Sequence, residues 1–272
     1  MINRRLFVAG LAVAPLAGCA HVRPAAPPPT LNVATFNIWH DREDWPARLP
    51  LVVAALREVD ADIVGLQEVL EDAAKGLPNQ AATLAQALGY RMLFVSTDAE
   101  GAPRRYGNAI LTRLPIVDHA WKKLEPLDDY RTALRVRVLA GGRPVDVVNT
   151  HMHHTAEGGA IRGRQTADLL TWLGQRDAPL IVLGDFNAVQ EDPGLAAFTG
   201  ERFVSALPRG AAATTLSSAA GHPPRVIDHI FAEAAAFEPI AGRVFAAQAV
   251  NGVWPSDHFG VAATLRLKPV GA

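Results

Sequence analysis

The fold of this chain is decided by the stretch Leu183-Gly184-Asp185-Phe186-Asn187 and, further on, by Ser256-Asp257-His258. Residues 180–184 form a short apolar run, which indicates a buried strand. Asp185 and Asn187 come directly after it, at the start of a loop rich in Asp, Pro and Gly. Loops at strand ends are where catalytic side chains tend to be displayed. The stretch therefore predicts a polar site at the end of a β-sheet.

The same pattern, polar side chains at the end of an apolar strand, recurs elsewhere in the chain. It is found in Thr35-Phe36-Asn37, Leu66-Gln67-Glu68, Asn149-Thr150-His151 and Ile227-Asp228-His229. A charge on the inward side of a strand is costly unless it is paired or bound to a metal. One such position is compatible with a structural salt bridge. A set that recurs at strand ends is better explained by one shared polar site.

The spacing of apolar residues predicts packed sheets covered by helices. Helices are expected where apolar residues recur at helical spacing, as in Leu49, Val52, Val53 and Leu56. The predicted helices are 46–58, 77–88 and 159–173. The predicted strands are 31–39, 62–69, 91–95, 108–112, 116–124, 132–139, 145–150, 180–184, 213–216, 226–232, 243–247 and 259–267.

The residue types in these segments favour metal-assisted hydrolysis. Glu68, Asp257 and the amide of Asn37 offer oxygen ligands, which suit a hard ion such as Mg²⁺ or Mn²⁺. Zinc prefers more His or Cys, and its usual ligand spacings are absent from the sequence. A bound cation polarises a phosphoryl oxygen. A nearby carboxylate activates water, and an imidazole acts on the leaving side.

Taken in order, the segments resemble those of the endonuclease/exonuclease/phosphatase superfamily, over about residues 31–267. That group includes pancreatic-type deoxyribonuclease, abasic-site endonucleases, bacterial sphingomyelinases and inositol-phosphate 5-phosphatases. Leu-Gln-Glu alone is a weak signal, but Gly-Asp-Phe-Asn followed by Ser-Asp-His is a strong one. The resemblance implies an α/β (α+β) fold: a four-layer sandwich of two mostly antiparallel β-sheets flanked by helices.

The resemblance also implies roles for single residues. Glu68 would be the principal ligand of Mg²⁺ or Mn²⁺, with Asn37 beside it and Asp257 serving the same or a second ion. Asp185 would position and activate the water, and Asn187 would bind a non-bridging phosphate oxygen.

The two remaining catalytic groups implied by the resemblance are histidines. His258 would contact the scissile phosphate, oriented by Asp228, and His151 would act on the phosphate or the leaving group. Asn108 and Arg131 would be substrate-side contacts. Relatives often have an acidic residue just before that arginine, where this chain has Tyr130. His153, His154 and His229 are expected to be structural or exposed, and Arg162, Arg164 and Gln165 to lie on an exposed helix face.

The first residues predict export and lipid anchoring. Arg4 and Arg5 precede an apolar run that is too short to span a bilayer as a mature helix. Leu-Ala-Gly-Cys, ending at Cys19, then resembles the bacterial lipobox, and the arginine pair resembles a twin-arginine signal. We therefore expect a signal peptide at 1–18 and a lipidated Cys19 on the periplasmic side of a bacterial membrane. The alternative is a short core helix with a buried cysteine.

Residues 19–30 are expected to be a tether, because Pro24, Pro27, Pro28 and Pro29 favour extended chain that packs no core. The catalytic domain is then 31–272. Cys19 is the single cysteine, so no intramolecular disulfide is possible.

Overall charge bears on the choice of substrate. The 272 residues carry a formal net charge of −1, and without Arg4 and Arg5 the balance is 24 basic against 27 acidic residues. Proteins that hold nucleic acid through phosphate contacts usually show a basic face. A nuclease acting on DNA or RNA outside the cytoplasm is therefore an alternative, but it is not favoured. A non-catalytic, lipid-anchored binding protein is a remote one, because none of the catalytic residues is lost. The identity of the phosphoester substrate and the oligomeric state stay open.

Overall fold

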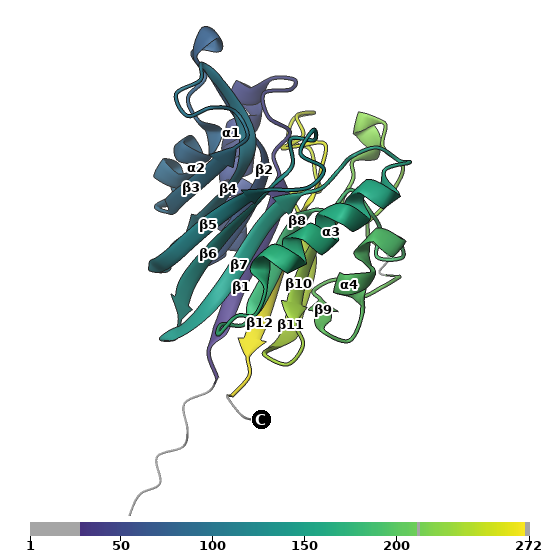
Figure 1. Ribbon diagram of the computed structural model, residues 1–272. Coiled ribbons are helices and arrows are strands. Elements are labelled where there is room, and N and C mark those ends of the chain that lie inside the picture. Colours follow the sequence, from purple (N-terminus) through teal and green to yellow (C-terminus); the bar gives the residue numbers. More distant parts are fainter. Residues whose placement is uncertain (1–27, 211–212, 270–272) are drawn as a thin grey trace, which may run out of the picture.

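The computed structural model of the protein describes residues 28–210 and 213–269 (Figure 1). The predicted signal peptide, Cys19 and most of the tether lie outside the described residues. Two six-stranded sheets make up the body of the fold. The strands of the first sheet are, in spatial order, β11 (Phe237–Phe245), β12 (Gly260–Leu267), β1 (Thr30–Asn37), β2 (Ile63–Asp72), β4 (Arg104–Thr112) and β3 (Arg91–Ser96).

The second sheet is formed by the middle of the chain. Its strands are β5 (Ile116–Lys123), β6 (Thr132–Ala140), β7 (Arg143–His151), β8 (Leu180–Asp185), β10 (Asp228–Glu233) and β9 (Phe203–Ser205). One pair in each sheet is parallel, β1 with β2 and β7 with β8, and the other pairs are antiparallel. The prediction of two mostly antiparallel sheets is confirmed.

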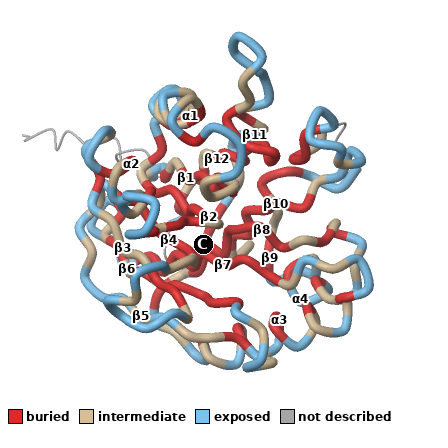
Figure 2. The backbone as a smooth tube through the Cα atoms, turned by 90° about the horizontal axis from the view of Figure 1, so that it is seen from above, coloured by how far each residue is buried: buried red, intermediate tan, exposed pale blue. Residues whose placement is uncertain are grey.

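Alternation along the strands explains why the sheets pack face to face. In β1, Leu31 and Val33 belong to the core between the sheets, whereas Ala34 and Phe36 face the helices. In β7, Val145 and Val147 likewise point into the intersheet core and Val148 points outward. Successive side chains of a strand point to opposite faces, so each sheet has two apolar faces to cover. Figure 2 shows the buried centre of the sandwich within an exposed rim.

Helices cover both outer faces and complete four layers (Figure 1). The first sheet is covered by α1 (Trp45–Val59) and α2 (Gln80–Leu88), and the second by α3 (Gly159–Leu173) and α4 (Ala196–Thr199). Asp44 and Asn79 cap the first two helices by accepting backbone N–H groups. Short 3₁₀ helices are η1 (Ala73–Lys75), η2 (Pro193–Leu195) and η3 (Ser218–Ala220).

Amide side chains connect the two sheets across their shared core. Asn149 of β7 donates to the carbonyls of Leu66 and Ala109 in the first sheet, both at 2.8 Å. Gln67 of β2 donates to the Asn149 side-chain oxygen at 2.6 Å. The sheets approach closely here, since a Cβ on Gly65 would lie 2.1 Å from Leu183. These buried bonds fix how one sheet sits over the other.

The structure corrects some expected elements. The strand predicted at 213–216 is wrong: in the described part of this segment Leu216 makes only an isolated bridge to His258. The hydroxyls of Thr214 and Thr215 bond backbone groups around Arg225 and compete with a regular ladder. The short β9 and α4 were not predicted. Among the described residues, no helix is both long and apolar enough to cross a membrane.

Candidate active site

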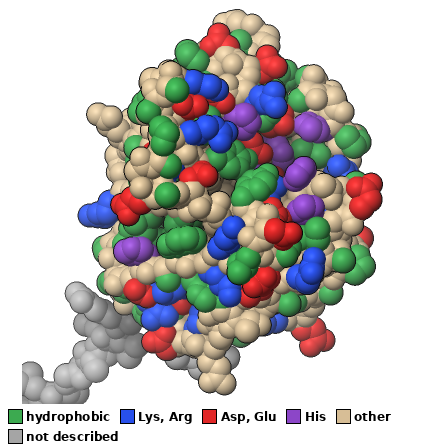
Figure 3. Space-filling view, turned by 45° about the horizontal axis from the view of Figure 1, so that its top comes forward, with side chains coloured by type: hydrophobic (Ala, Val, Ile, Leu, Met, Phe, Trp, Pro, Cys, Tyr) green, Lys and Arg blue, Asp and Glu red, His purple; other side chains and the backbone are tan. Residues whose placement is uncertain are grey.

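The site lies at one end of the intersheet core, where the inward positions of the strands change from apolar to polar. In β1, Leu31 and Val33 are followed on the same face by Thr35 and Asn37. In β8, Ile181 and Leu183 are followed by Asp185. Thr30 pairs with Arg266, so Asn37 lies at the end of the sandwich opposite the described termini. Figure 3 shows histidine, acidic and basic side chains gathered on this upper face.

Strand register places three side chains of the second sheet in one row. His151 of β7 pairs with Asp185 of β8, and Asp185 pairs with Asp228 of β10. All three are buried. Because paired residues on neighbouring strands project to the same face, the row meets Asn37 across the gap between the sheets.

Asp185 is the centre of the site and is 1% exposed. Its Oδ2 accepts a hydrogen bond from Asn37 Nδ2 at 3.0 Å and lies 3.3 Å from His151 Nε2. His258 Nε2 lies 3.8 Å from the same oxygen. The Asn187 backbone N–H donates to Oδ1 at 2.9 Å. The groups expected to act on water and phosphate therefore meet at one carboxylate.

His258 and Asp228 form the predicted pair. The His258 Nδ1 lies 3.0 Å from Asp228 Oδ2, and the carboxylate is fully buried. This contact leaves Nε2 directed toward Asp185. The tertiary pairing expected from the resemblance is present in the structure, and it fixes the orientation of the ring.

Burial and neighbouring charges separate the proton affinities of these groups. Burial, and then the charge of Asp228, raise the pKa of Asp185 to about 6. Burial alone would lower the pKa of His258, but Asp228 and Asp185 outweigh it and raise the pKa well above its ordinary value. Burial, followed by the charge of Arg131, lowers the pKa of His151 well below the usual range. His258 is thus an imidazolium and His151 a neutral imidazole at neutral pH.

Two site residues hold a left-handed backbone, which is rare outside glycine. Glu68 has φ 59° and Asn187 has φ 50°. At Glu68, β2 bulges against β4 between Leu66 and Val69, and a bulge re-aims the side chains beside it. Such conformations cost on the order of 1–3 kcal/mol and cluster at functional sites. The side chain of Asn187 donates to the Met152 carbonyl at 3.0 Å.

The predicted metal ligands lie together beside this centre. Asn37 Nδ2 donates to Glu68 Oε1 at 3.1 Å, and the Asn37 oxygen accepts the Trp39 N–H. The amide nitrogen, and not the oxygen expected as a ligand, thus faces the carboxylates; a half-turn of the amide exchanges them. Burial raises the pKa of Glu68, and the charge of Asp257 adds to this. Ser256 joins the set by donating to the Asn37 carbonyl at 2.7 Å.

The charges of the site fit a divalent cation. The carboxylates of Asp185, Asp228 and Asp257 are buried at this end of the core and that of Glu68 is partly buried beside them, with the protonated His258 bonded to Asp228. An excess of buried negative charge is costly without a further cation. Carboxylate and amide oxygens are the ligands that Mg²⁺ prefers. The residues present therefore suit the predicted metal.

A second grouping in the same place also has metal-binding geometry. Asp185, Asp228 and His258 offer ligand atoms within 4.8 Å of one another. The His258–Asp228 contact already uses one imidazole nitrogen, and an imidazolium does not ligate a metal. In the geometry observed the trio is suited to holding protons, and the oxygen-rich set leaves more ligand atoms for a cation.

Arg48 was missed by sequence reasoning, yet it links the loop that follows Asn37 to the segment that carries Asp257. It is 1% exposed, and its five N–H donors bond the carbonyls of five residues. These residues are Ile38, Trp39, His40, Arg42 and Pro255. Its partners are backbone atoms, so no side-chain pattern in the sequence points to it.

Two histidines next to the carboxylates were also missed. His222 Nε2 lies 3.1 Å from Asp257 Oδ2, and His40 Nε2 lies 3.9 Å from Glu68 Oε2. Both come from loops, where periodicity carries no information. Asn108, which follows Tyr106 and Gly107 and was expected to contact the substrate, is buried, and its side chain donates to the Thr132 carbonyl and hydroxyl at 3.2 and 3.0 Å.

Several other polar residues that the sequence singled out are buried. Arg131 is 3% exposed, with Nη2 3.3 Å from His154 Nδ1. His229 is buried and contacts the Ala188 carbonyl at 2.8 Å, in agreement with a structural role. The expectation that Arg162 and Gln165 lie on an exposed face is wrong, because both are buried and bond the loop that carries His153.

Comparison with a family model gives a match to the Endonuclease/Exonuclease/phosphatase family over residues 34–258. A search among curated protein sequences found no match. Among solved structures, a family protein from Bacteroides thetaiotaomicron has a TM-score of 0.73 at 22% identity, covering 90% of this chain and 100% of that one.

Two further solved structures are similar to this chain. A family protein from Beutenbergia cavernae is 26% identical, with a TM-score of 0.69, and covers 90% of this chain and 74% of its own. The human Nocturnin catalytic domain, solved with a bound sulfate anion, is 22% identical with a TM-score of 0.71, covering 88% and 94%. At sequence identities below 25%, such a similarity shows a shared fold and nothing more.

Proposed function

Because the chain belongs to the endonuclease/exonuclease/phosphatase family, we propose that it is a divalent-metal-dependent hydrolase that cleaves a phosphoester bond outside the cytoplasm. One observation carries the proposal: the Glu68–Asn37 pair and the His258–Asp228 pair, from different sheet regions, converge on Asp185. A purely structural cluster has no need of a carboxylate whose pKa is raised to about 6.

The cation would be held by Glu68, Asp257 and Asn37. Bound there, Mg²⁺ or Mn²⁺ would polarise a phosphoryl oxygen and offset the negative charge that develops on it. The remaining chemistry belongs to the side chains of the chain. These groups are already ordered by the hydrogen bonds described above, which is the preorganisation that electrostatic catalysis requires.

Asp185 is the base that accepts a proton from the attacking water, because its pKa of about 6 leaves it ionised at neutral pH and still basic. His258, charged and oriented by Asp228, donates through Nε2 to a phosphate oxygen. His151 is neutral, so it acts as a hydrogen-bond donor and not as a strong acid. Asn187 has one amide hydrogen beyond the bond to Met152 for a non-bridging oxygen.

The location outside the cytoplasm rests on the N-terminal sequence. Arg4, Arg5, the apolar run and the Leu-Ala-Gly-Cys ending at Cys19 are typical of a lipoprotein signal. Cys19→Ala should leave the protein unlipidated and either unprocessed or released from membranes. Mass spectrometry of native material that finds an intact, unlipidated Met1 start would contradict the export proposal.

The activity is tested with the full chain on a panel of phosphomonoesters, phosphodiesters and nucleic acids, in Mg²⁺ and in Mn²⁺. Hydrolysis of at least one class is expected, with loss in Asp185→Asn and in excess chelator. Preferential hydrolysis of DNA or RNA would make the chain a nuclease. If the folded protein binds a compound of the panel but hydrolyses none of them, the chain is a binding protein instead.

A further inference from the structure

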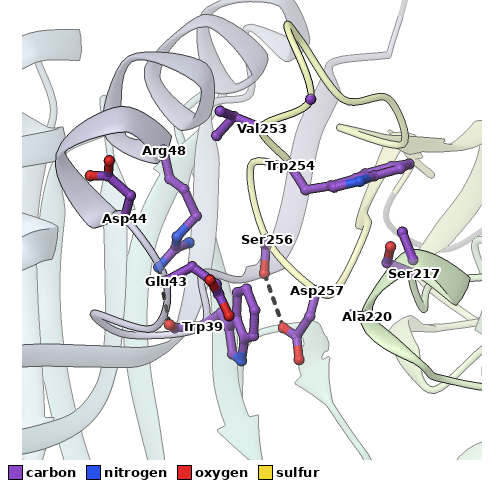
Figure 4. A pocket seen from close by; sticks show the side chains of 12 residues that line it. Trp39, Glu43, Asp44, Arg48, Ser217, Ala220, Val253, Trp254, Ser256 and Asp257 are labelled. Carbon is purple, nitrogen blue, oxygen red and sulfur yellow. Dashed lines mark hydrogen bonds between the residues drawn. The ribbon is translucent and has the colours of Figure 1, made fainter.

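A cavity of about 310 Å³ opens beside Asp257 (Figure 4). Its walls include the indole rings of Trp39 and Trp254, and its rim carries Glu43 and Asp44. Neither Glu43 nor Trp254 has a part in the chemistry described above. Because Asp257 itself lines the cavity, the cavity adjoins the predicted metal ligands.

The charge of this cavity is unsuited to anions. Glu43 and Asp44 supply two carboxylates in addition to Asp257 of the predicted metal ligands, and Arg48 is the cation among the lining residues. All five N–H donors of Arg48 are already bonded to backbone carbonyls, so it has no donor left for a guest. Among the described residues, the Glu43 carboxylate has no hydrogen-bond or ion-pair partner. A guest therefore meets acceptors and negative charge.

The aromatic walls add an attraction for cations. The Arg48 guanidinium already lies over the Trp39 ring, 5.3 Å from its centre, and this contact is a cation–π interaction within the cavity wall. Trp254 is held in place by Phe259, which stacks on it with ring centres 5.8 Å apart. Indole rings fixed in this way present a negative face to a positive group.

Ser217 provides an independent indication that a ligand belongs here. Its side chain lines the cavity and is 1% exposed, yet its hydroxyl has no hydrogen-bond partner among the described residues. A buried polar atom without a partner costs about 1–3 kcal/mol. A polar guest would satisfy this hydroxyl, and an N–H donor is the kind of group that also suits the carboxylates beside it.

We propose that this cavity binds a protonated primary amine at the end of a short ester substituent of the substrate. Glu43 and Asp44 supply the opposite charge, Trp39 and Trp254 the aromatic faces, and Ser217 an acceptor for an ammonium N–H. The proposal rests on the proposed function, since it assumes that the phosphate is held at the adjoining site. It predicts that the enzyme selects phosphoesters of amino alcohols over neutral esters of the same shape.

The test compares phosphoethanolamine with propyl phosphate, which has the same shape but carries a methyl group where the other has an ammonium. Binding to the full chain is measured calorimetrically in Mg²⁺, and each compound is also tested as an inhibitor of the best panel substrate. Phosphoethanolamine should bind about tenfold more tightly, as expected for a cation that gains aromatic and charged partners. Phosphocholine, which has no N–H for Ser217, should bind more weakly than phosphoethanolamine.

Variants assign the preference to the cavity. Glu43→Gln and Trp254→Leu should each weaken phosphoethanolamine binding several-fold and leave propyl phosphate binding unchanged. Glu201→Gln, which removes another exposed acid, should change neither. Equal affinities of the wild type for the two compounds would overturn the amine proposal while leaving hydrolysis of other esters intact. Absence of both binding and hydrolysis would instead refute the proposed function along with it.

Discussion

Replacing Arg48 with methionine should destabilise the protein by about 4 kcal/mol. The five bonds from the guanidinium to carbonyls contribute about 7 kcal/mol at the low end of the range for charged hydrogen bonds. Against this stands the cost of burying the charge. Burial lowers the pKa of Arg48 from its ordinary value to about 10, which corresponds to about 3 kcal/mol. The difference is the stability that the substitution removes.

Urea unfolding at equilibrium measures this loss, with Arg57→Met as the matched control. Arg57 is exposed on the same helix and makes one long contact, at 3.4 Å, to a carbonyl. The control should change stability by less than about 0.5 kcal/mol. Arg48→Met should also weaken Mg²⁺ binding, because the bond to the Pro255 carbonyl positions the segment that carries Asp257. A stability loss below about 1 kcal/mol, with Mg²⁺ affinity unchanged, would refute the reasoning.

Three further outcomes follow from the site and the core. Glu68→Gln should lower turnover by at least about a hundredfold and weaken Mg²⁺ binding without loss of stability. Full activity of the variant would contradict Glu68 as a metal ligand, and so would full activity of the wild type in excess chelator. Asp228→Asn should move the alkaline limb of the pH–rate profile to lower pH, because a carboxylate that raises the pKa of His258 is lost; an unmoved limb would show that this imidazolium is not required. Burial lowers the pKa of His229 to about 4, so the folded state binds fewer protons than the unfolded state below pH 6.5. Stability should therefore be complete above pH 6.5 and fall by about 3 kcal/mol as the pH drops through 4, and His229→Phe should remove this part of the loss in acid unfolding curves.

The regular alternation of side chains along the strands made the sheets and part of the site predictable. Apolar residues at positions 31 and 33 followed by polar ones at 35 and 37 already indicate a core that becomes polar at one end. The same pattern places Asp185 after its strand. Side chains at strand ends in one sheet must meet their neighbours, so the row of His151, Asp185 and Asp228 follows from topology once the strands are paired.

Features that depend on backbone atoms or loop geometry were not predictable in this way. The bulge that turns Glu68 falls on Gln67 and Glu68, neither of which is Gly or Pro. Arg48 is recognised only by carbonyls, and every residue type carries a carbonyl. His222 reaches Asp257 from a loop 35 residues away in the sequence. Such contacts depend on the three-dimensional path of the chain, on which side-chain periodicity carries no information.

The amide bonds between the sheets have a consequence for engineering. Asn149 is fully buried between the sheets, where a design procedure that rewards only stability would place leucine. That choice would remove the contacts that align one sheet with the other. Asn37 and Glu68 belong to the first sheet and Asp185 to the second, so a small sliding of the layers would separate the reacting groups. A thermostable but inactive enzyme, with every catalytic side chain intact, is the expected product of such a redesign.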